Sequence, residues 1–206
     1  MRVGKLCPSV SPRGFTLIEL MVVVAIIGVL AVLAVFGVSR YINSSKASEA
    51  LNNLGAISKN ASESLMREPM IGSFVAPGQK VNTYHCICGT ATNTVPASAA
   101  SIKGKKYVSD PLQDWRQAGS ITTESNIGWR CLRYSIDYPQ YFMYSYTESS
   151  ASCTSGSITG DVVHAIANGD LNGNGILSTF DLQGQVNTGQ TQLTWAPVPL
   201  ATLPQE

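Results

Sequence analysis

The chain has 206 residues, of which 44% are hydrophobic and 13% charged, and its formal net charge is +1 at pH 7. This length corresponds to about one ordinary domain. The nearly balanced charge excludes the strongly basic field that recruits nucleic acid.

Residues 15–38 form an apolar run in which Glu19 is the only ionisable side chain. A helix of this length, at a rise of about 1.5 Å per residue, is long enough to cross a bilayer. A carboxylate in such a segment costs about 2.5 kcal/mol or more. The sequence therefore predicts one membrane-compatible helix whose acid must either be protonated or find a cationic partner.

Gly14 and the following residues 15–28, FTLIELMVVVAIIG, resemble the class III signal of type IV prepilins and of the related pseudopilins of type II secretion. The resemblance implies cleavage between Gly14 and Phe15 by a prepilin peptidase, N-methylation of Phe15, and packing of the helices into a filament. It also implies that Glu19 neutralises the terminal amine of a neighbouring subunit. The alternative to processing is an uncleaved single-pass anchor. The alternative for Glu19 is a self-capped helix terminus, in which the acid favours the positive end of its own helix.

Residues 1–14 form the leader that the resemblance predicts to be removed. They contain Arg2, Lys5 and Arg13 and no acid, so the positive-inside rule keeps them cytoplasmic and places the head outside. Cleavage leaves 11 of the 14 Lys and Arg residues against 13 Asp and Glu, a charge of about −2. The apolar run follows the cut site and is retained, unlike that of an ordinary secretory signal.

Residues 39–68 continue the helix with an amphipathic pattern. Their apolar side chains recur at steps of three and four, among them Leu54, Ile57 and Leu65, and Pro69 ends the pattern. We expect one helix over residues 15–67, whose first half is apolar all round and whose second half packs on a head formed by residues 69–206.

The head begins with a loop-rich stretch over residues 69–124, from which Trp115 is expected to pack toward the core together with Trp129. Strands are predicted at 130–136 and 141–147, joined by a hairpin turn, and at 161–167 and 191–195. Residues 177–182 are either a short strand or a helix. The predicted fold class is α+β, a pilin-like roll in which one long N-terminal helix packs against a C-terminal antiparallel sheet.

Four cysteines remain after loss of the leader: Cys86, Cys88, Cys131 and Cys153. In an oxidising compartment they form disulfides. Cys86 and Cys88 are too close to pair comfortably, so each crosses to Cys131 or Cys153, and both connectivities stay open. A zinc site at residues 85–88 is disfavoured because no second paired ligand set exists.

Residues 170–181, DLNGNGILSTFD, have the spacing of an EF-hand calcium loop, with glycine at the sixth position and a carboxylate at the twelfth. The alternative is an Asn/Gly-rich turn that needs no metal. No other cofactor is required by the sequence. The calcium ligands would be Asp170, Asn172, Asn174, the Ile176 carbonyl, Ser178 and Asp181.

No enzymatic activity is predicted. The two histidines are His85 and His164, and His164 falls in an expected buried strand. A nucleophile elbow, a phosphate loop and a pair of catalytic acids are all missing from the sequence.

The favoured hypothesis is a structural subunit, major or minor, of a type IV pilus that serves adhesion, surface motility or DNA uptake. One alternative is a pseudopilin of a type II secretion system, and another is a membrane-tethered binding module that never polymerises. The resemblance implies other pilin subunits, the prepilin peptidase, the assembly platform, its ATPase and a secretin as partners. It also implies an inner-membrane precursor with a periplasmic head, followed by an extracellular pilus.

Overall fold

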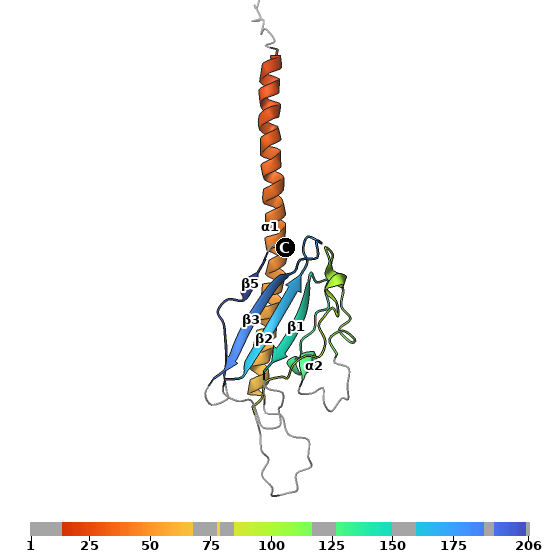
Figure 1. The fold of residues 1–206 in the computed structure, drawn as a ribbon, viewed down its shortest axis with the longest axis vertical. Helices are drawn as coiled ribbons and strands as arrows, with labels where there is room; N and C mark the ends of the chain where they lie inside the picture. Colours follow the sequence, from red (N-terminus) through yellow and green to blue (C-terminus); the bar gives the residue numbers. More distant parts are fainter. Residues whose placement is uncertain are drawn as a thin grey trace, which may run out of the picture. The chain divides into compact units, whose positions relative to one another are not determined.

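The computed structural model describes residues 14–67, 78, 85–116, 127–149, 160–187 and 192–204. The chain forms two compact units, Met1–Tyr41 and Ile42–Glu206. One helix, α1 (Leu17–Met66), begins in the first unit and ends in the second (Figure 1). The single helix predicted over residues 15–67 is therefore confirmed to within two residues at either end.

In the first unit, the apolar surface of α1 is exposed among the described residues. Its large hydrophobic side chains between residues 15 and 38 are between 43% and 78% exposed. By length and composition α1 can cross a membrane, and none of its most apolar 18-residue window is buried. A helix that is apolar all round and uncovered requires lipid or other helices as surroundings.

In the second unit, α1 buries one stripe. The side chains on this stripe recur every three or four residues and are fully buried. Its polar residues Lys59 and Glu63 face solvent and form an exposed i,i+4 ion pair. The predicted amphipathic half is therefore confirmed, and its buried apolar residues are Ala50, Leu54, Ile57, Ala61 and Leu65.

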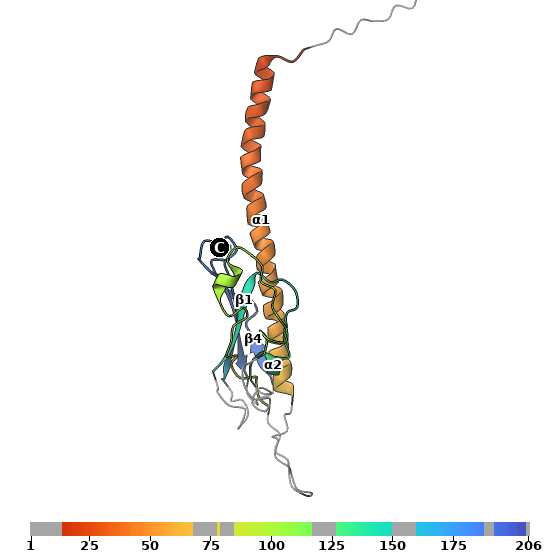
Figure 2. The same cartoon turned by 90° about the vertical axis from the view of Figure 1, so that its right-hand side faces the viewer.

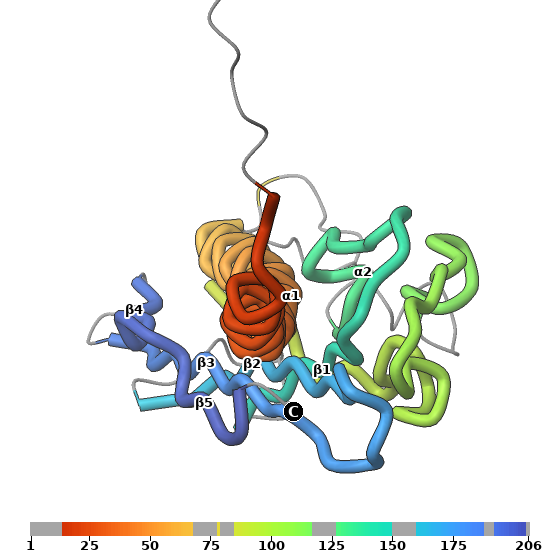
Figure 3. The backbone as a smooth tube through the Cα atoms, turned by 90° about the horizontal axis from the view of Figure 1, so that it is seen from above, coloured from red at the N-terminus to blue at the C-terminus, as the bar shows by residue number. Residues whose placement is uncertain are grey.

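The stripe packs on one face of a five-stranded sheet (Figure 3). The strands are β1 (Phe142–Glu148), β2 (Val162–Gly169), β3 (Ser178–Val186), β4 (Leu193–Trp195) and β5 (Leu200–Thr202). All pairs are antiparallel in the order β1-β2-β3-β4, and β5 also pairs with β3. The α+β architecture is as predicted, although β5 was not expected.

The core lies between α1 and the sheet. Alternation along β1 turns Phe142, Tyr144 and Tyr146 inward, and all three are fully buried. Trp115 and Trp129 pack edge to face with ring centroids 4.9 Å apart, and they are 2% and 0% exposed. The prediction that both tryptophans join the core is confirmed.

The strand predicted at 130–136 is wrong. The chain instead forms a short helix, α2 (Gly128–Leu132), which Arg133 ends in a left-handed conformation with φ 55°. β-branched and aromatic bias favoured a strand, but burial of Trp129 and Cys131 on one turn of helix outweighs this local preference.

The free edge of β1 is covered by residues 89–96 (Figure 2). Backbone hydrogen bonds of 3.0 Å run from the Ala91 N–H to the Tyr146 carbonyl and from the Val95 N–H to the Tyr144 carbonyl. A short 3₁₀ helix, η1 (Ala99–Ile102), follows this segment. The loop-rich stretch therefore blocks the edge at which β1 would otherwise pair with another chain.

Candidate functional site

The start of α1 is a capping box between Thr16 and Glu19. The Thr16 backbone N–H and hydroxyl each donate a hydrogen bond of 2.8 Å to Glu19 Oε2. In return, the Glu19 N–H donates to Thr16 Oγ1 at 3.3 Å. These reciprocal bonds satisfy backbone donors that a helix N-terminus otherwise leaves unpaired.

Glu19 lies in an apolar groove on the helix surface, lined also by Phe15, Ile18, Val22 and Val23. Neither of the two ion pairs found among the described residues involves Glu19. The carboxylate thus has local hydrogen-bond donors but no cation in the described part of the single chain. Its predicted role in neutralising a neighbouring amine stays a prediction.

The predicted cleavage bond lies just before the helix. Gly14 and Phe15 are exposed and precede the first helical residue. No heavy atom outside the adjoining residues comes within 4 Å of a Cβ placed on Gly14. A peptidase would therefore meet this bond in open space, although cleavage itself and methylation of Phe15 stay predictions.

One of the two open disulfide connectivities is supported. Cys88 is bonded to Cys131, with a Cα–Cα distance of 5.6 Å. Cys86 is also disulfide-bonded, but Cys153 lies outside the described residues, so the pairing of Cys86 with Cys153 stays a prediction. The Cys88 bond joins the segment after α1 to α2.

The residues proposed as calcium ligands are divided between two places. Asp170 is buried and closes its own turn: Oδ1 accepts from the Gly173 N–H at 2.7 Å and Oδ2 from the Gly175 N–H at 2.9 Å. The amide oxygens of Asn172 and Asn174 accept from backbone N–H groups two residues ahead. These oxygens stabilise the turn itself.

Asp181 lies elsewhere, in β3 opposite Ile166. Ser178, which pairs with Gly169 at the start of the strand, is three positions away, or about 10 Å at the rise of a strand. Ser178 Oγ donates to the Gly169 carbonyl at 3.0 Å. The six oxygens do not form one ring, so the geometry fits a metal-free turn better than a calcium site, and calcium binding stays an untested prediction.

The expectation that His164 is buried is wrong. Its side chain lies on the outer face of β2 and is 33% exposed, and Nδ1 is 3.1 Å from both carboxylate oxygens of Asp181. Gln183 Nε2 donates to the same carboxylate at 3.0 Å. Alternation explains the difference, because Val163 and Ala165 take the inward positions on either side of His164.

Sequence reasoning missed Thr16 as a partner of Glu19. The signal was present, because Thr16 and Glu19 have the T-x-x-E spacing of a capping box directly before an apolar helix. The described residues contain no group of three His, Cys, Asp or Glu side chains that could hold a metal, and the expectation that the cysteines bind no zinc stays a prediction. The functional geometry of the first unit therefore centres on Thr16, Glu19 and the apolar surface around them.

Comparison with known proteins gives one match. Residues 11–35 match the family model described as the prokaryotic N-terminal methylation motif. No curated protein and no solved structure matches the chain. Residues 11–35 thus give this chain the signature of the type IV prepilin-like proteins.

Proposed function

We propose that this chain is a structural subunit, major or minor, of a type IV pilus, and that it polymerises through α1. The observation that carries the proposal is the uncovered apolar surface of residues 15–38, with its large side chains 43–78% exposed, in a segment that overlaps the methylation motif. Such a surface needs apolar surroundings, which either lipid or copies of the same helix can supply. The filament would serve adhesion, surface motility or DNA uptake.

The proposed sequence of events begins in the inner membrane. Residues 15–38 hold the precursor there with the head in the periplasm, and a prepilin peptidase removes residues 1–14. The new amine of Phe15 is methylated and, with an ordinary pKa of about 8, is cationic. Glu19 of an adjacent subunit neutralises this amine as the helices move from the lipid into the filament core. The assembly platform and its ATPase drive this movement, and the growing filament passes through a secretin.

Two substitutions separate the two roles of Glu19. Glu19→Gln keeps an oxygen that can accept the capping bond from the Thr16 N–H but removes the charge, whereas Glu19→Ala removes both. If charge neutralisation drives assembly, both variants are cleaved normally yet form few or short filaments. Mass spectrometry of the mature chain measures the loss of residues 1–14, and electron microscopy measures filament yield and length.

Normal filament yield and length from Glu19→Gln would contradict the proposal that the Glu19 charge neutralises a neighbouring amine. A defect in Glu19→Ala alone would assign the residue to helix capping. A full-length chain in the membrane, with residues 1–14 retained, would contradict the proposed processing independently of Glu19.

The same helix would serve a pseudopilin of type II secretion. Imaging of surface filaments, set against an assay of protein export in a deletion strain, separates the two functions. A membrane-tethered module that never polymerises would give only monomers when single cysteines placed along residues 20–38 are crosslinked in the membrane.

A further inference from the structure

Four lysines lie around the turn at residues 170–175, at the end of the second unit where α1 enters it (Figure 1). We call this end of the head the entry end. Lys46 Nζ donates a hydrogen bond of 3.3 Å to the Leu171 carbonyl. The Gly104 N–H donates one of 2.9 Å to the Asp170 carbonyl, so the segment that contains Gly104 runs beside the same turn. The four members of this lysine cluster are Lys46, Lys103, Lys105 and Lys106.

The lysine cluster presents its charge at the surface. Lys103, Lys105 and Lys106 are exposed, and Lys46 is half-buried. The amines of Lys46 and Lys106 lie 5.0 and 4.7 Å from the centroid of the Tyr141 ring, within the range of cation–π contacts. Neither of the two ion pairs found among the described residues includes a member of the cluster. The charge of the cluster is therefore available to an anionic partner.

Two acids lie beside the cluster in the described part of the chain, and backbone donors occupy both. Asp170 is 2% exposed, and its carboxylate oxygens accept from the Gly173 and Gly175 N–H groups. Glu49 is half-buried and accepts from the Tyr141 N–H at 2.8 Å. The four lysines outnumber these two acids, so the entry end is electropositive.

Exposed apolar side chains accompany the lysines at the entry end. Ile176 follows the turn and is 49% exposed. Strand register brings the end of β5 to the same place, because Thr202 pairs with Thr179 at the start of β3. Leu203, the next residue, is 51% exposed. A surface that combines lysines with exposed aliphatic side chains is typical of protein segments that lie in the membrane interface.

The apolar run of α1 ends close to the lysine cluster. Lys46 is eight positions beyond Val38, so their Cα atoms are at most about 12 Å apart along the helix. The headgroup layer is about 5–8 Å thick on each side of the hydrocarbon core, and the field of anionic lipids falls off over a further distance of about 8 Å. When residues 15–38 span a bilayer, Lys46 therefore lies within the field of its headgroups.

We propose that the entry end docks on anionic phospholipid headgroups, with the lysine cluster against the lipid phosphates and Ile176 and Leu203 among the headgroups. This inference rests on the proposed membrane stage of the subunit, in which residues 15–38 span the bilayer. Because α1 tethers the head to the bilayer, docking is intramolecular, and a few charges suffice at the resulting effective concentration of lipid. Each lysine near an anionic surface favours docking about fivefold.

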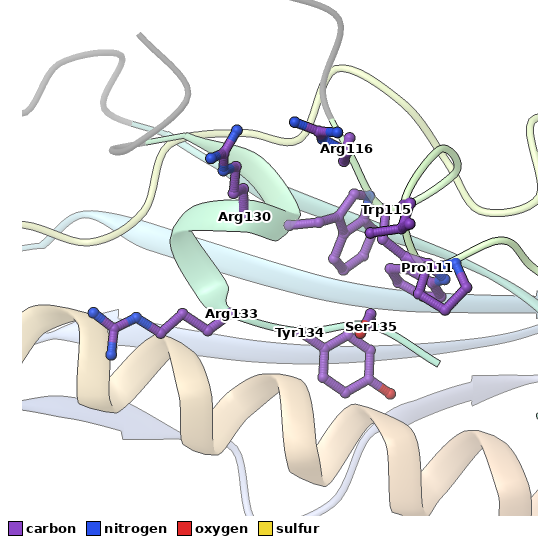
Figure 4. Close-up of a pocket in the computed structure, with 9 residues that line it drawn as sticks. Pro111, Trp115, Arg116, Arg130, Arg133, Tyr134 and Ser135 are labelled. Atoms are coloured by element: carbon purple, nitrogen blue, oxygen red, sulfur yellow. The ribbon is translucent and has the colours of Figure 1, made fainter. Parts of the chain in front are cut away.

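The arginines at the opposite end of the head form no comparable surface. Arg67, just after the end of α1, donates to the Cys131 carbonyl of α2, which places α2 far from the entry end. The guanidinium groups around the groove beside α2 point apart (Figure 4). They belong to Arg116, Arg130 and Arg133. A change of charge at Arg133 is therefore a matched control for a change of charge in the lysine cluster.

The test inserts the full chain into vesicles of phosphatidylcholine alone or with about one-third phosphatidylglycerol, an anionic lipid. A membrane-impermeant reagent acetylates the lysines, and mass spectrometry measures the rate at each position. Docking should slow the acetylation of Lys103 and Lys105 severalfold in the anionic vesicles only, and high salt should restore it. Lys59, whose side chain is 76% exposed and which lies further along α1, is the internal control and should react equally in both vesicles.

Two variants test whether charge causes the protection. Lys105→Gln removes one charge at an exposed position, and it should lower the protection of Lys103 in the anionic vesicles by about fivefold. Arg133→Gln removes the same charge at the other end of the head and should leave that protection unchanged. Equal effects of the two variants would overturn the assignment to the entry end.

Equal acetylation of Lys103 in neutral and anionic vesicles, in a chain that floats with both, would overturn the docking and leave the proposed function intact. Failure of the chain to float with either vesicle would overturn both, because residues 15–38 would then not hold it in a membrane. Protection that appears in neutral vesicles and grows with the number of chains per vesicle would also overturn the docking on lipid, since the occupant would be a second copy.

Discussion

The side-chain amide of Asn53 on α1 donates a hydrogen bond of 2.7 Å to the hydroxyl of Tyr144 on β1. Asn53 Oδ1 accepts a second bond of 2.7 Å from the Tyr138 hydroxyl. Asn53 is 5% exposed and Tyr144 is fully buried, so water cannot readily replace these partners. We expect Asn53→Leu, which keeps the volume, to lower the free energy of unfolding by about 1–3 kcal/mol because it leaves the buried Tyr144 hydroxyl unpaired.

Urea unfolding of the detergent-solubilised chain, followed by tryptophan fluorescence, measures this loss. Tyr138→Phe is the matched control, because Tyr138 is 46% exposed and its removal costs only the outer bond. Its loss should be smaller, about 0.5–1.5 kcal/mol. Equal stability of Asn53→Leu and the parent chain would show that the Asn53–Tyr144 hydrogen bond does not stabilise the packing of α1 on the sheet.

Two glycines should respond in opposite directions to alanine. A Cβ on Gly169 would lie 2.6 Å from the Phe142 ring, which is fully buried and has no room to move. Gly169→Ala should therefore destabilise the head by about 1–3 kcal/mol. Gly55, an exposed position of α1 with nothing within 4 Å of a new Cβ, should gain about 0.5–1 kcal/mol in helix stability when changed to alanine. A Gly169→Ala chain as stable as the parent would refute the tight contact.

The Asp170 turn can be tested together with its predicted calcium. Because both carboxylate oxygens accept backbone N–H groups, Asp170→Asn should lower the melting temperature to the same extent in millimolar calcium and in chelator. The control is Asp137→Asn, at an exposed position. A melting temperature of the parent chain that rises with calcium, and does not rise in Asp170→Asn, would instead establish the turn as a calcium site.

Glu49, in the half of α1 that packs on the sheet, should make stability depend on pH. Burial raises the pKa of its carboxyl, in spite of the 2.8 Å bond from the Tyr141 N–H and the charge of Lys106, both of which lower it. The folded state thus binds the proton more tightly than the unfolded state, so this contribution to stability grows as pH falls through the folded pKa and is lost at higher pH.

Glu49→Gln keeps an acceptor for Tyr141 and removes the titration. The difference in unfolding free energy between Glu49→Gln and the parent should favour the variant more at pH 7 than below pH 4.5, the ordinary pKa of the carboxyl. Urea unfolding of both chains across this pH range measures this difference. The contributions of the other acidic residues are the same in both chains and cancel. A difference that does not change with pH would contradict the assignment to Glu49.

Sequence periodicity predicted the elements whose burial follows a simple repeat. The apolar stripe of α1 and the alternation of Phe142, Tyr144 and Tyr146 are local signals that tertiary contacts reinforce. Residues 130–136 were misassigned because α2 is held by distant partners, Cys88 and Asn93, which leave no local pattern. The turn at 170–175 has the correct EF-hand spacing, but strand register carries Asp181 away from it, and register depends on the rest of the sheet.

The capping box at the start of α1 has a consequence for proteolysis. Its three bonds join Thr16 and Glu19 only, and both residues follow the proposed cut after Gly14. Removal of the leader would therefore break none of the bonds that begin the helix. The precursor and the mature chain would share one fixed helix start, so that the amine created by processing emerges at a constant axial position from every subunit.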